Sequence, residues 1–523
     1  MLKSMYFNRK LIRKIGQMNE KNINKLKLNT ITPLMPQLAT IISGFLIPRL
    51  ILKYFGTNVN GLIQSITQFL SIITFMEAGV GSVIRYNLYK PLYDKNNYEL
   101  SKIIVSARKF FRRIAFLFLG YTLILMFSYP SINKNEFSHL YTAILIAAMC
   151  ISYFAQYYFG QVNQLLLTAD QRGYIQYITQ AITIVANTIA CAIMIKMGAG
   201  IHIVKLATSI IFLIRPIFLE WYVNRHYRID FKVTYEGEPI KQKWNGFAQH
   251  ITAVILESTD IIILTIFTTL ANVSIYSAYH MVVYGIKTLM ATATNGIEVL
   301  IGNIIASNNI KKLESVFSFT EWAIHSIAGF VYGCTAILIV PFIMVYTKGV
   351  YDINYNVPIF ALLITLANLS HTLRLPYSII VLSSGHYKET QNSYIITSAI
   401  NLVISVIFVK RFGLIGVAIG TLVSMVYQII WLAWYSYKKI LKRNLWYLIK
   451  QLFVDVVSFC TMYFIGSTLE IDQSSYYAWI ISAIKITVIC SIVLLFINFA
   501  VYSTNMKKIY YIWTKKHSRE KTR

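Results

Sequence analysis

The sequence predicts an all-α polytopic membrane protein with about fourteen transmembrane helices. Three observations predict this class: 56% of the 523 residues are hydrophobic, only 13% are charged, and the apolar residues fall in runs long enough to cross a bilayer. Soluble domains carry about a quarter charged residues, which excludes a soluble fold. The net charge of +28 does not indicate nucleic acid as a partner, because most basic residues lie in short connections between the runs.

Fourteen apolar runs have the length of a membrane span, and the connections between them are too short for a folded extramembrane domain. With the N-terminus inside, the inner connections hold 37 of the 49 Lys and Arg residues and the outer ones hold seven. This asymmetry predicts that both termini are cytoplasmic. The runs cover residues 31–53, 61–84, 111–129, 140–166, 174–195, 202–223, 248–271, 275–305, 317–346, 358–382, 393–409, 413–436, 451–469 and 477–502.

Short residue pairs recur at a nearly constant offset, which predicts an internal repeat. Asn58-Val59 and Asn272-Val273 are 214 residues apart, and two Trp-Tyr pairs, beginning at Trp221 and Trp434, are 213 apart. The offset indicates two parallel six-helix lobes related by a pseudo-two-fold axis, followed by two appended helices. The expected parts are a basic N-terminal segment, an N-lobe, a cytoplasmic linker, a C-lobe, a helix pair and a basic tail, at residues 1–30, 31–223, 224–247, 248–436, 437–502 and 503–523.

A series of motifs follows the predicted helices in order. They are FMEAGVGSVIRYNLYKPLYDKNN (75–97), ESTDIIILTIFTTLANVSIYSAY (257–279), the Gly302-Asn303 step, FIMVYTKGVYDINY (342–355), LRLPY (373–377) with GHYKETQ (385–391), and FGLIGVAIGTLV (412–423). Together they resemble the polysaccharide transport family of the multidrug/oligosaccharidyl-lipid/polysaccharide (MOP) exporter superfamily. This family contains the flippases for lipid-linked oligosaccharides of the O-antigen, capsule and exopolysaccharide type.

The resemblance implies a two-lobed helical bundle in the bacterial cytoplasmic membrane. Such a protein moves undecaprenyl-pyrophosphate-linked oligosaccharide from the inner to the outer leaflet by alternating access, with membrane lipid, a polysaccharide polymerase and other pathway proteins as partners. The sequence has no nucleotide-binding loop, no CxxC pair and no His ligand set, so no cofactor or metal is expected. The external connections are too short for a membrane-embedded polymerase or ligase, which argues against an enzyme. The alternative is a drug/cation antiporter of the same superfamily.

Basic residues at membrane depth predict a cavity that accepts an anionic group. Arg374, Lys287 and Arg215 are candidates for binding the pyrophosphate, since a guanidinium binds phosphate oxygens in a bidentate manner and stays charged. The alternative is that they pair with carboxylates and hold the lobes together. A proline follows Arg215 directly and Arg374 two residues later, which predicts a helix bend at each. Arg215 lies nearer the cytoplasmic end of its span, so reaching the inner interface is a further alternative for it. Arg49 is the fourth candidate, although it lies near enough to the outer end of its span to reach the headgroups.

Three carboxylates are predicted at the same depth. Glu257 and Asp260 are three residues apart within the run 251–270 and therefore share one helix face. Three roles remain open for them: counter-ions of the basic residues, sites that bind H⁺ or Na⁺ and couple transport to an ion gradient, or structural hydrogen-bond acceptors. Glu77, which Ala-Gly-Val-Gly follows, is the third candidate for an ion-coupling or counter-ion role, and close helix packing explains that segment equally well.

Overall fold

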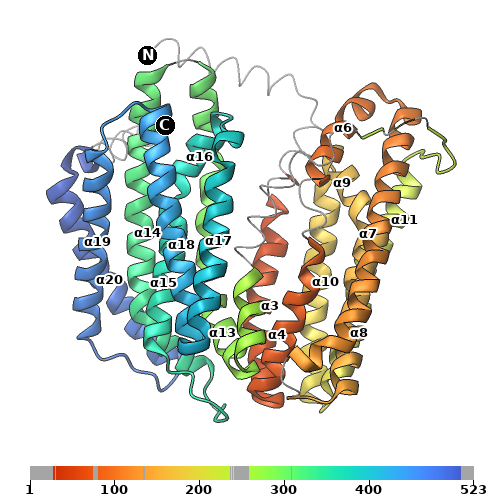
Figure 1. Cartoon of the computed structure of the whole chain (residues 1–523), viewed down its shortest axis with the longest axis horizontal. Helices are drawn as coiled ribbons and strands as arrows, with labels where there is room; N and C mark the ends of the chain where they lie inside the picture. Colours follow the sequence, from red (N-terminus) through yellow and green to blue (C-terminus); the bar gives the residue numbers. More distant parts are fainter. Residues whose placement is uncertain are drawn as a thin grey trace, which may run out of the picture. The chain divides into compact units, whose positions relative to one another are not determined.

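The computed structural model describes residues 28–29, 31–74, 80–132, 136–235, 237, 239–240, 258–307 and 309–507. Within these ranges every regular element is a helix (Figure 1), which confirms the predicted all-α class. Eleven of the described helical segments are long and apolar enough to cross a membrane, and each coincides with one of the predicted runs. The protein is therefore a multi-pass membrane protein.

The described residues do not determine whether the three other predicted runs cross the membrane. The runs 61–84 and 248–271 both extend into residues outside the described ranges. The run 275–305 lies within α13 (Leu270–Ala306), a continuous helix of 37 residues. The polytopic class is confirmed, whereas the number of fourteen spans stays a prediction.

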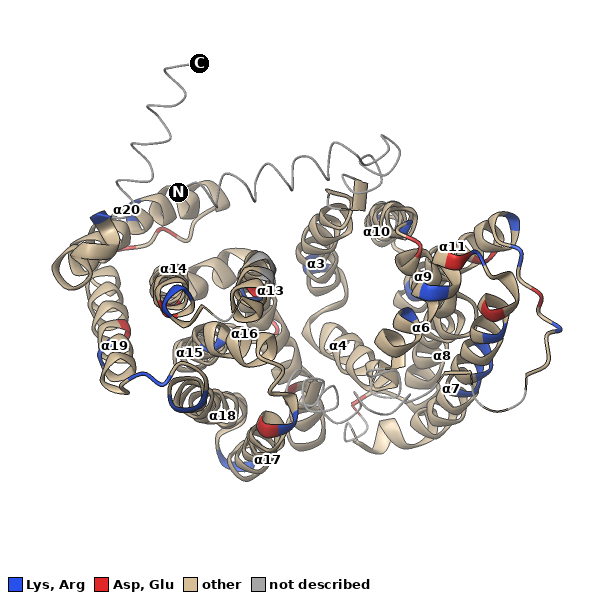
Figure 2. Ribbon diagram, turned by 90° about the horizontal axis from the view of Figure 1, so that it is seen from above, with Lys and Arg blue, Asp and Glu red and all other residues tan. Residues whose placement is uncertain are grey.

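The chain divides into two compact units. Unit 1 comprises residues 1–55 and 66–254, and unit 2 comprises residues 56–65 and 255–523, so the boundary falls inside the helix α4. The first residues of α4 pack closely within unit 2: a Cβ atom on Gly61 would lie 1.9 Å from the carbonyl oxygen of Leu270. Seen along the helices, many of the described Lys and Arg residues lie at helix ends and in connections (Figure 2).

Unit 1 consists of antiparallel helices joined by short turns. The helix that follows the α7–α8 connection changes from α to π winding for five residues, and this irregular turn contributes to the cavity described below. Its core contains large, fully buried aromatic side chains, among them Phe111, Phe118 and Tyr129. The elements are α3 (Leu34–Phe55), the end of α4 (Thr57–Ser71), α6 (Val80–Asp94), α7 (Asn97–Ile132), α8 (His139–Ala155), η1 (Gln156–Gly160), α9 (Gln161–Ala169), α10 (Gly173–Lys196) and α11 (Ile201–His226).

Unit 2 is built around α14, which packs against helices on several sides. The helix is interrupted at Arg374: one helix ends at Leu373 and the next begins at Leu375, because Pro376 has no N–H to continue the hydrogen-bond ladder, and the predicted bend there stays a prediction. The described elements are a helix at Ser258–Phe267, then α13, α14 (Ile310–Tyr346), α15 (Pro358–Leu373), α16 (Leu375–Ser383), α17 (Tyr387–Phe412), α18 (Leu414–Tyr435), η2 (Ser436–Ile440), α19 (Trp446–Ser467) and α20 (Tyr476–Val501).

Candidate functional site

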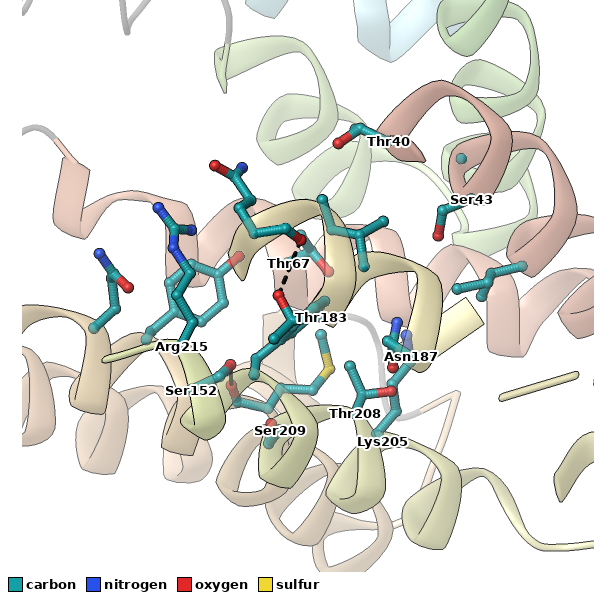
Figure 3. Close-up of a pocket in the computed structure, with 18 of the residues that line it drawn as sticks. Thr40, Ser43, Thr67, Ser152, Thr183, Asn187, Lys205, Thr208, Ser209 and Arg215 are labelled. Atoms are coloured by element: carbon teal, nitrogen blue, oxygen red, sulfur yellow. Dashed lines mark hydrogen bonds between the residues drawn. The ribbon is translucent and has the colours of Figure 1, made fainter. Parts of the chain in front are cut away.

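Unit 1 contains an open cavity of about 660 Å³ (Figure 3). Seven elements of the unit contribute to its wall, and most of the side chains that reach it carry hydroxyl, amide or basic groups. The lining residues are Thr40, Ser43, Gly44, Ile47 and Pro48 from α3, Thr67 from α4, Met149, Ser152 and Tyr153 from α8, Gln156 and Gln164 from η1 and α9, Gln180, Thr183, Ile184 and Asn187 from α10, and Lys205, Thr208, Ser209, Phe212 and Arg215 from α11.

Both basic residues of the cavity wall come from α11. Lys205 and Arg215 are ten residues apart, so their Cα atoms are separated by about 15 Å along the helix axis. The lining residues between them follow helical spacing, which places all five on one face of α11. The Nε–H of Arg215 is buried and has no hydrogen-bond partner among the described residues. The helix runs through Pro216 without interruption, although that residue leaves the carbonyl of Phe212 without its usual helical donor.

The cavity wall contains no Asp or Glu among its described residues. The acidic residue of α11, Glu220, forms an ion pair with Arg108 at 2.9 Å and accepts a hydrogen bond from the Asn163 amide at 2.6 Å. The amide Nε2 of Gln164 is also buried without a partner among the described residues. The cavity therefore combines two cations with unused hydrogen-bond donors, a composition suited to an anionic ligand that carries hydroxyl groups.

A second group of polar residues lies in unit 2 at the break between α15 and α16. Arg374 occupies the break and donates from Nη1 to the Oε1 of Gln428 on α18, while its Nη2 lies 2.8 Å from the Nε2 of His371. Lys287 on α13 interacts electrostatically with His371 and with Asp260. The structure thus brings three of the predicted site residues together, and we name these five residues the unit 2 cluster.

Asp260 is the buried acid of this cluster, and only one of its two carboxyl oxygens accepts hydrogen bonds from the described residues. Its Oδ2 accepts hydrogen bonds from the hydroxyls of Tyr276 at 2.8 Å and Thr421 at 2.9 Å. The Thr421 hydroxyl in turn accepts from the amide of Asn401 at 3.0 Å. The Oδ1 of Asp260 is buried without a hydrogen bond among the described residues. A buried carboxyl with a vacant oxygen in this position is a candidate ligand for H⁺ or Na⁺.

The remaining predicted site residues lie elsewhere. Arg49 is half-buried on α3 in unit 1; it follows Pro48, which lines the cavity, but does not itself belong to the lining. Arg215 lines the cavity of unit 1, whereas Arg374 and Lys287 belong to unit 2. Glu257 and Glu77 lie outside the described residues.

Sequence reasoning missed Lys205 and the amide residues of the cavity. Lys205 is counted among the seven basic residues of the predicted outer connections. In the structure it lies within α11, which begins at Ile201. A usable signal exists, because Thr208 and Ser209 follow Lys205 by three and four residues and Arg215 follows Thr208 by seven, spacings that place them on one helix face. No comparable signal exists for Gln156, which lies in a π-helical turn that its sequence does not predict.

The spanning helices place charged and polar side chains between them in both units. No protein-family model and no curated protein sequence matches the chain. Solved structures do: the lipid II flippase MurJ in an inward closed conformation is 16% identical, with a TM-score of 0.69 over 92% of this chain and 99% of that chain.

Two transporters of the multidrug type are also similar. An inward-facing multidrug resistance MATE family transporter of the MOP superfamily is 14% identical, with a TM-score of 0.61 over 79% of this chain and 99% of that chain. The Vibrio cholerae MATE transporter VcmN is 14% identical, with a TM-score of 0.54 over 81% of this chain and 98% of that chain. These similarities confirm the MOP fold that the motifs imply, and at this level of identity they show the fold alone.

Proposed function

We propose that the protein is a flippase of the polysaccharide transport family. It translocates undecaprenyl-pyrophosphate-linked oligosaccharide across the bacterial cytoplasmic membrane by alternating access, in the biosynthesis of a surface polysaccharide. The observation that carries this proposal is the unit 1 cavity, which has two basic side chains and no acidic one among its described lining residues. A drug/cation antiporter would instead require carboxylates facing the cavity, because its substrates are cations.

A basic side chain at membrane depth raises the free energy of inserting its helix. A basic side chain at the centre of a spanning helix costs about 2.5 to 3.5 kcal/mol on insertion scales. Arg215 lies near the middle of α11, its Nε–H has no hydrogen-bond partner among the described residues, and no ion pair among them includes it, so no described carboxylate offsets this cost. A pyrophosphate offers oxygens to the planar guanidinium fork, and the amides and hydroxyls of the wall can bind sugar hydroxyls.

The unit 2 cluster supplies the second part of the proposal. Arg374 and Lys287 bind the anionic headgroup at a later stage of transport, and units 1 and 2 move as the two lobes. Asp260 binds the coupling cation, H⁺ or Na⁺, through its vacant Oδ1. The electrostatic interaction between Asp260 and Lys287 supports this role, because a cation bound at Asp260 weakens the hold of the carboxylate on the ammonium.

The test is translocation of an undecaprenyl-pyrophosphate-linked oligosaccharide in proteoliposomes, with and without an imposed H⁺ or Na⁺ gradient. Wild type is compared with the Lys205→Gln/Arg215→Gln double variant and with the matched control Lys196→Gln, an exposed position at the end of α10 outside the cavity. We expect protein-dependent translocation that is lost in the double variant and kept in the control. The proposal is wrong if wild type moves no lipid-linked sugar but exchanges organic cations for protons, in which case the antiporter function replaces it.

A further inference from the structure

A buried group of titratable side chains joins α14 to α19 and is separate from the unit 2 cluster. His325 on α14 is completely buried. Its Nδ1 lies 2.6 Å from the Oδ2 of Asp455 on α19, and its Nε2 lies 3.4 Å from the hydroxyl of Tyr377 on α16. The Asp455 side chain is 11% exposed, so the pair is not completely enclosed by the protein. The sequence alone predicts no role for α19 and α20, and this contact is a polar one within the packing of α19 against α14.

The surroundings of His325 contain two acids. Glu321, one helical turn earlier on α14, accepts hydrogen bonds from the hydroxyls of Tyr377 at 2.9 Å and Tyr437 at 2.7 Å, and lies 3.5 Å from Arg443. Among the described residues, the charged and titratable groups around His325 are Glu321 of α14, Tyr377 of α16, Tyr437 of η2, Arg443 of the η2–α19 connection, Asp455 of α19 and Tyr502 after α20.

Charge balance indicates the protonation state of the imidazole in this arrangement. Arg443 compensates Glu321, so Asp455 is compensated only when His325 carries its second proton. A buried carboxylate without a partner is strongly destabilising. Gln451 donates one hydrogen bond to Asp455 at 3.1 Å, but a neutral amide supplies no charge. Because histidine is the side chain that ordinarily gains or loses its charge between about pH 5 and 8, this ion pair is conditional, unlike one made by Arg or Lys.

The same imidazole contacts the broken helix on both sides of Arg374. It interacts with the backbone carbonyl of Leu373, the last residue of α15, and with the hydroxyl of Tyr377 in the first turn of α16. Pro376 removes one hydrogen bond from the ladder across the break, so side-chain contacts of this kind contribute to holding the two helices in place. A change at His325 is therefore transmitted to the position of Arg374.

We propose that His325 and Asp455 form a proton-binding site that sets the position of Arg374. With the proton bound, the imidazolium ties α19 to α14 and holds the α15–α16 break in the arrangement seen here. When the proton leaves to solvent, Asp455 loses its counter-charge, α19 loosens from α14, and α16 moves relative to α15. The helix pair α19–α20 thus stabilises this arrangement of α15 and α16 only while the proton is bound. The link to transport rests on the proposed function, in which Arg374 binds substrate, but the proton site itself does not.

The test measures amide hydrogen exchange by mass spectrometry in the full chain in nanodiscs, without substrate. Peptides covering 370–386 and 446–467 are followed between about pH 5 and 8 after correction for intrinsic exchange rates. Wild type is compared with His325→Gln and Asp455→Asn. The control Trp322→Phe loses the 2.7 Å hydrogen bond from α14 to Asn498 of α20, and it leaves every titratable group of the network in place.

We expect protection of both segments in wild type to fall as pH rises, because the contact exists while the imidazole is protonated and is lost as it deprotonates. His325→Gln and Asp455→Asn should lose this pH dependence, and Trp322→Phe should keep it. A wild type without pH dependence, or a His325→Gln variant with the wild-type profile, would overturn the proposal. Because this experiment needs no substrate, its outcome is independent of the translocation assay. Loss of the pH dependence of translocation in His325→Gln then tests the link to Arg374.

Discussion

Replacing Arg215 by Gln should raise the stability of the substrate-free protein and weaken substrate binding. The first effect follows from the buried Nε–H, which has no hydrogen-bond partner among the described residues. No ion pair among those residues includes Arg215 either. An unsatisfied buried donor costs about 1 to 3 kcal/mol, and more when it is charged. Gln keeps a polar side chain in the wall and removes the charge, so we expect a gain in unfolding free energy of about 1 kcal/mol.

The second effect has the opposite sign. Hydrogen bonds to a charged group contribute about 1.5 to 3 kcal/mol, and the guanidinium fork can form two of them with one pyrophosphate. Since about 1.4 kcal/mol corresponds to a factor of ten, Arg215→Gln should lower the affinity for an undecaprenyl-pyrophosphate lipid by about 10-fold to 150-fold. Arg215→Lys should recover part of this loss, because the charge returns without the fork.

Both effects can be measured on the same detergent-solubilised samples, by thermal unfolding and by lipid binding. The matched control is Arg172→Gln, which removes an Arg from the α9–α10 connection, where it pairs with Asp170 at 2.9 Å and does not line the cavity. The control should leave binding unchanged. If Arg215→Gln lowers the stability of the substrate-free protein and leaves binding at the wild-type level, Arg215 is a structural residue and the reasoning fails.

Three further predictions follow. Arg374→Ala should lower translocation in proteoliposomes without lowering membrane abundance, since the break at α15–α16 depends on proline; equal loss of both would contradict a substrate role. Asp260→Asn should abolish the dependence of translocation on an imposed ion gradient, and a variant that still responds to the gradient would exclude Asp260 as the coupling residue. Gly420→Ala should reduce the melting temperature, because the added Cβ would lie 2.1 Å from the Ser405 hydroxyl and overpacking costs about 1 to 3 kcal/mol. The control Gly44→Ala should leave the melting temperature unchanged, because no atom lies within 4 Å of its added Cβ.

Sequence periodicity was sufficient for the helices that face lipid. Runs such as 174–195 and 477–502 match α10 and α20 within a few residues, because a span of fixed length must be apolar where it meets the hydrocarbon. The break at Arg374 was predictable for a local reason, the missing N–H of a nearby proline. The spanning helices and the break at Arg374 both depend on residues close to them in the sequence, so a single sequence is enough to predict them.

The composition of the sites was only partly predictable, because it depends on contacts between distant segments. The bases Arg215, Lys287 and Arg374 could be identified as exceptional by their depth alone. The hydrogen bonds of Asp260 with Tyr276 and Thr421 join residues 16 and 161 positions away in the sequence, and no periodic pattern predicts them. The single chain therefore revealed which residues are costly to bury, and the fold was needed to show what surrounds them.

The basic residues of the two units differ in how they are held, and this difference indicates an order of events. Arg215 forms no ion pair among the described residues, so an anion can bind it without displacing a carboxylate. Arg374 is held by Gln428 and His371, and Lys287 interacts with Asp260, so an anion must displace or supplement existing interactions there. Under the proposed function, the headgroup therefore engages the unit 1 cavity first. Engagement of the unit 2 cluster requires that Asp260 be neutralised by its cation, which is how ion binding would be coupled to the second step.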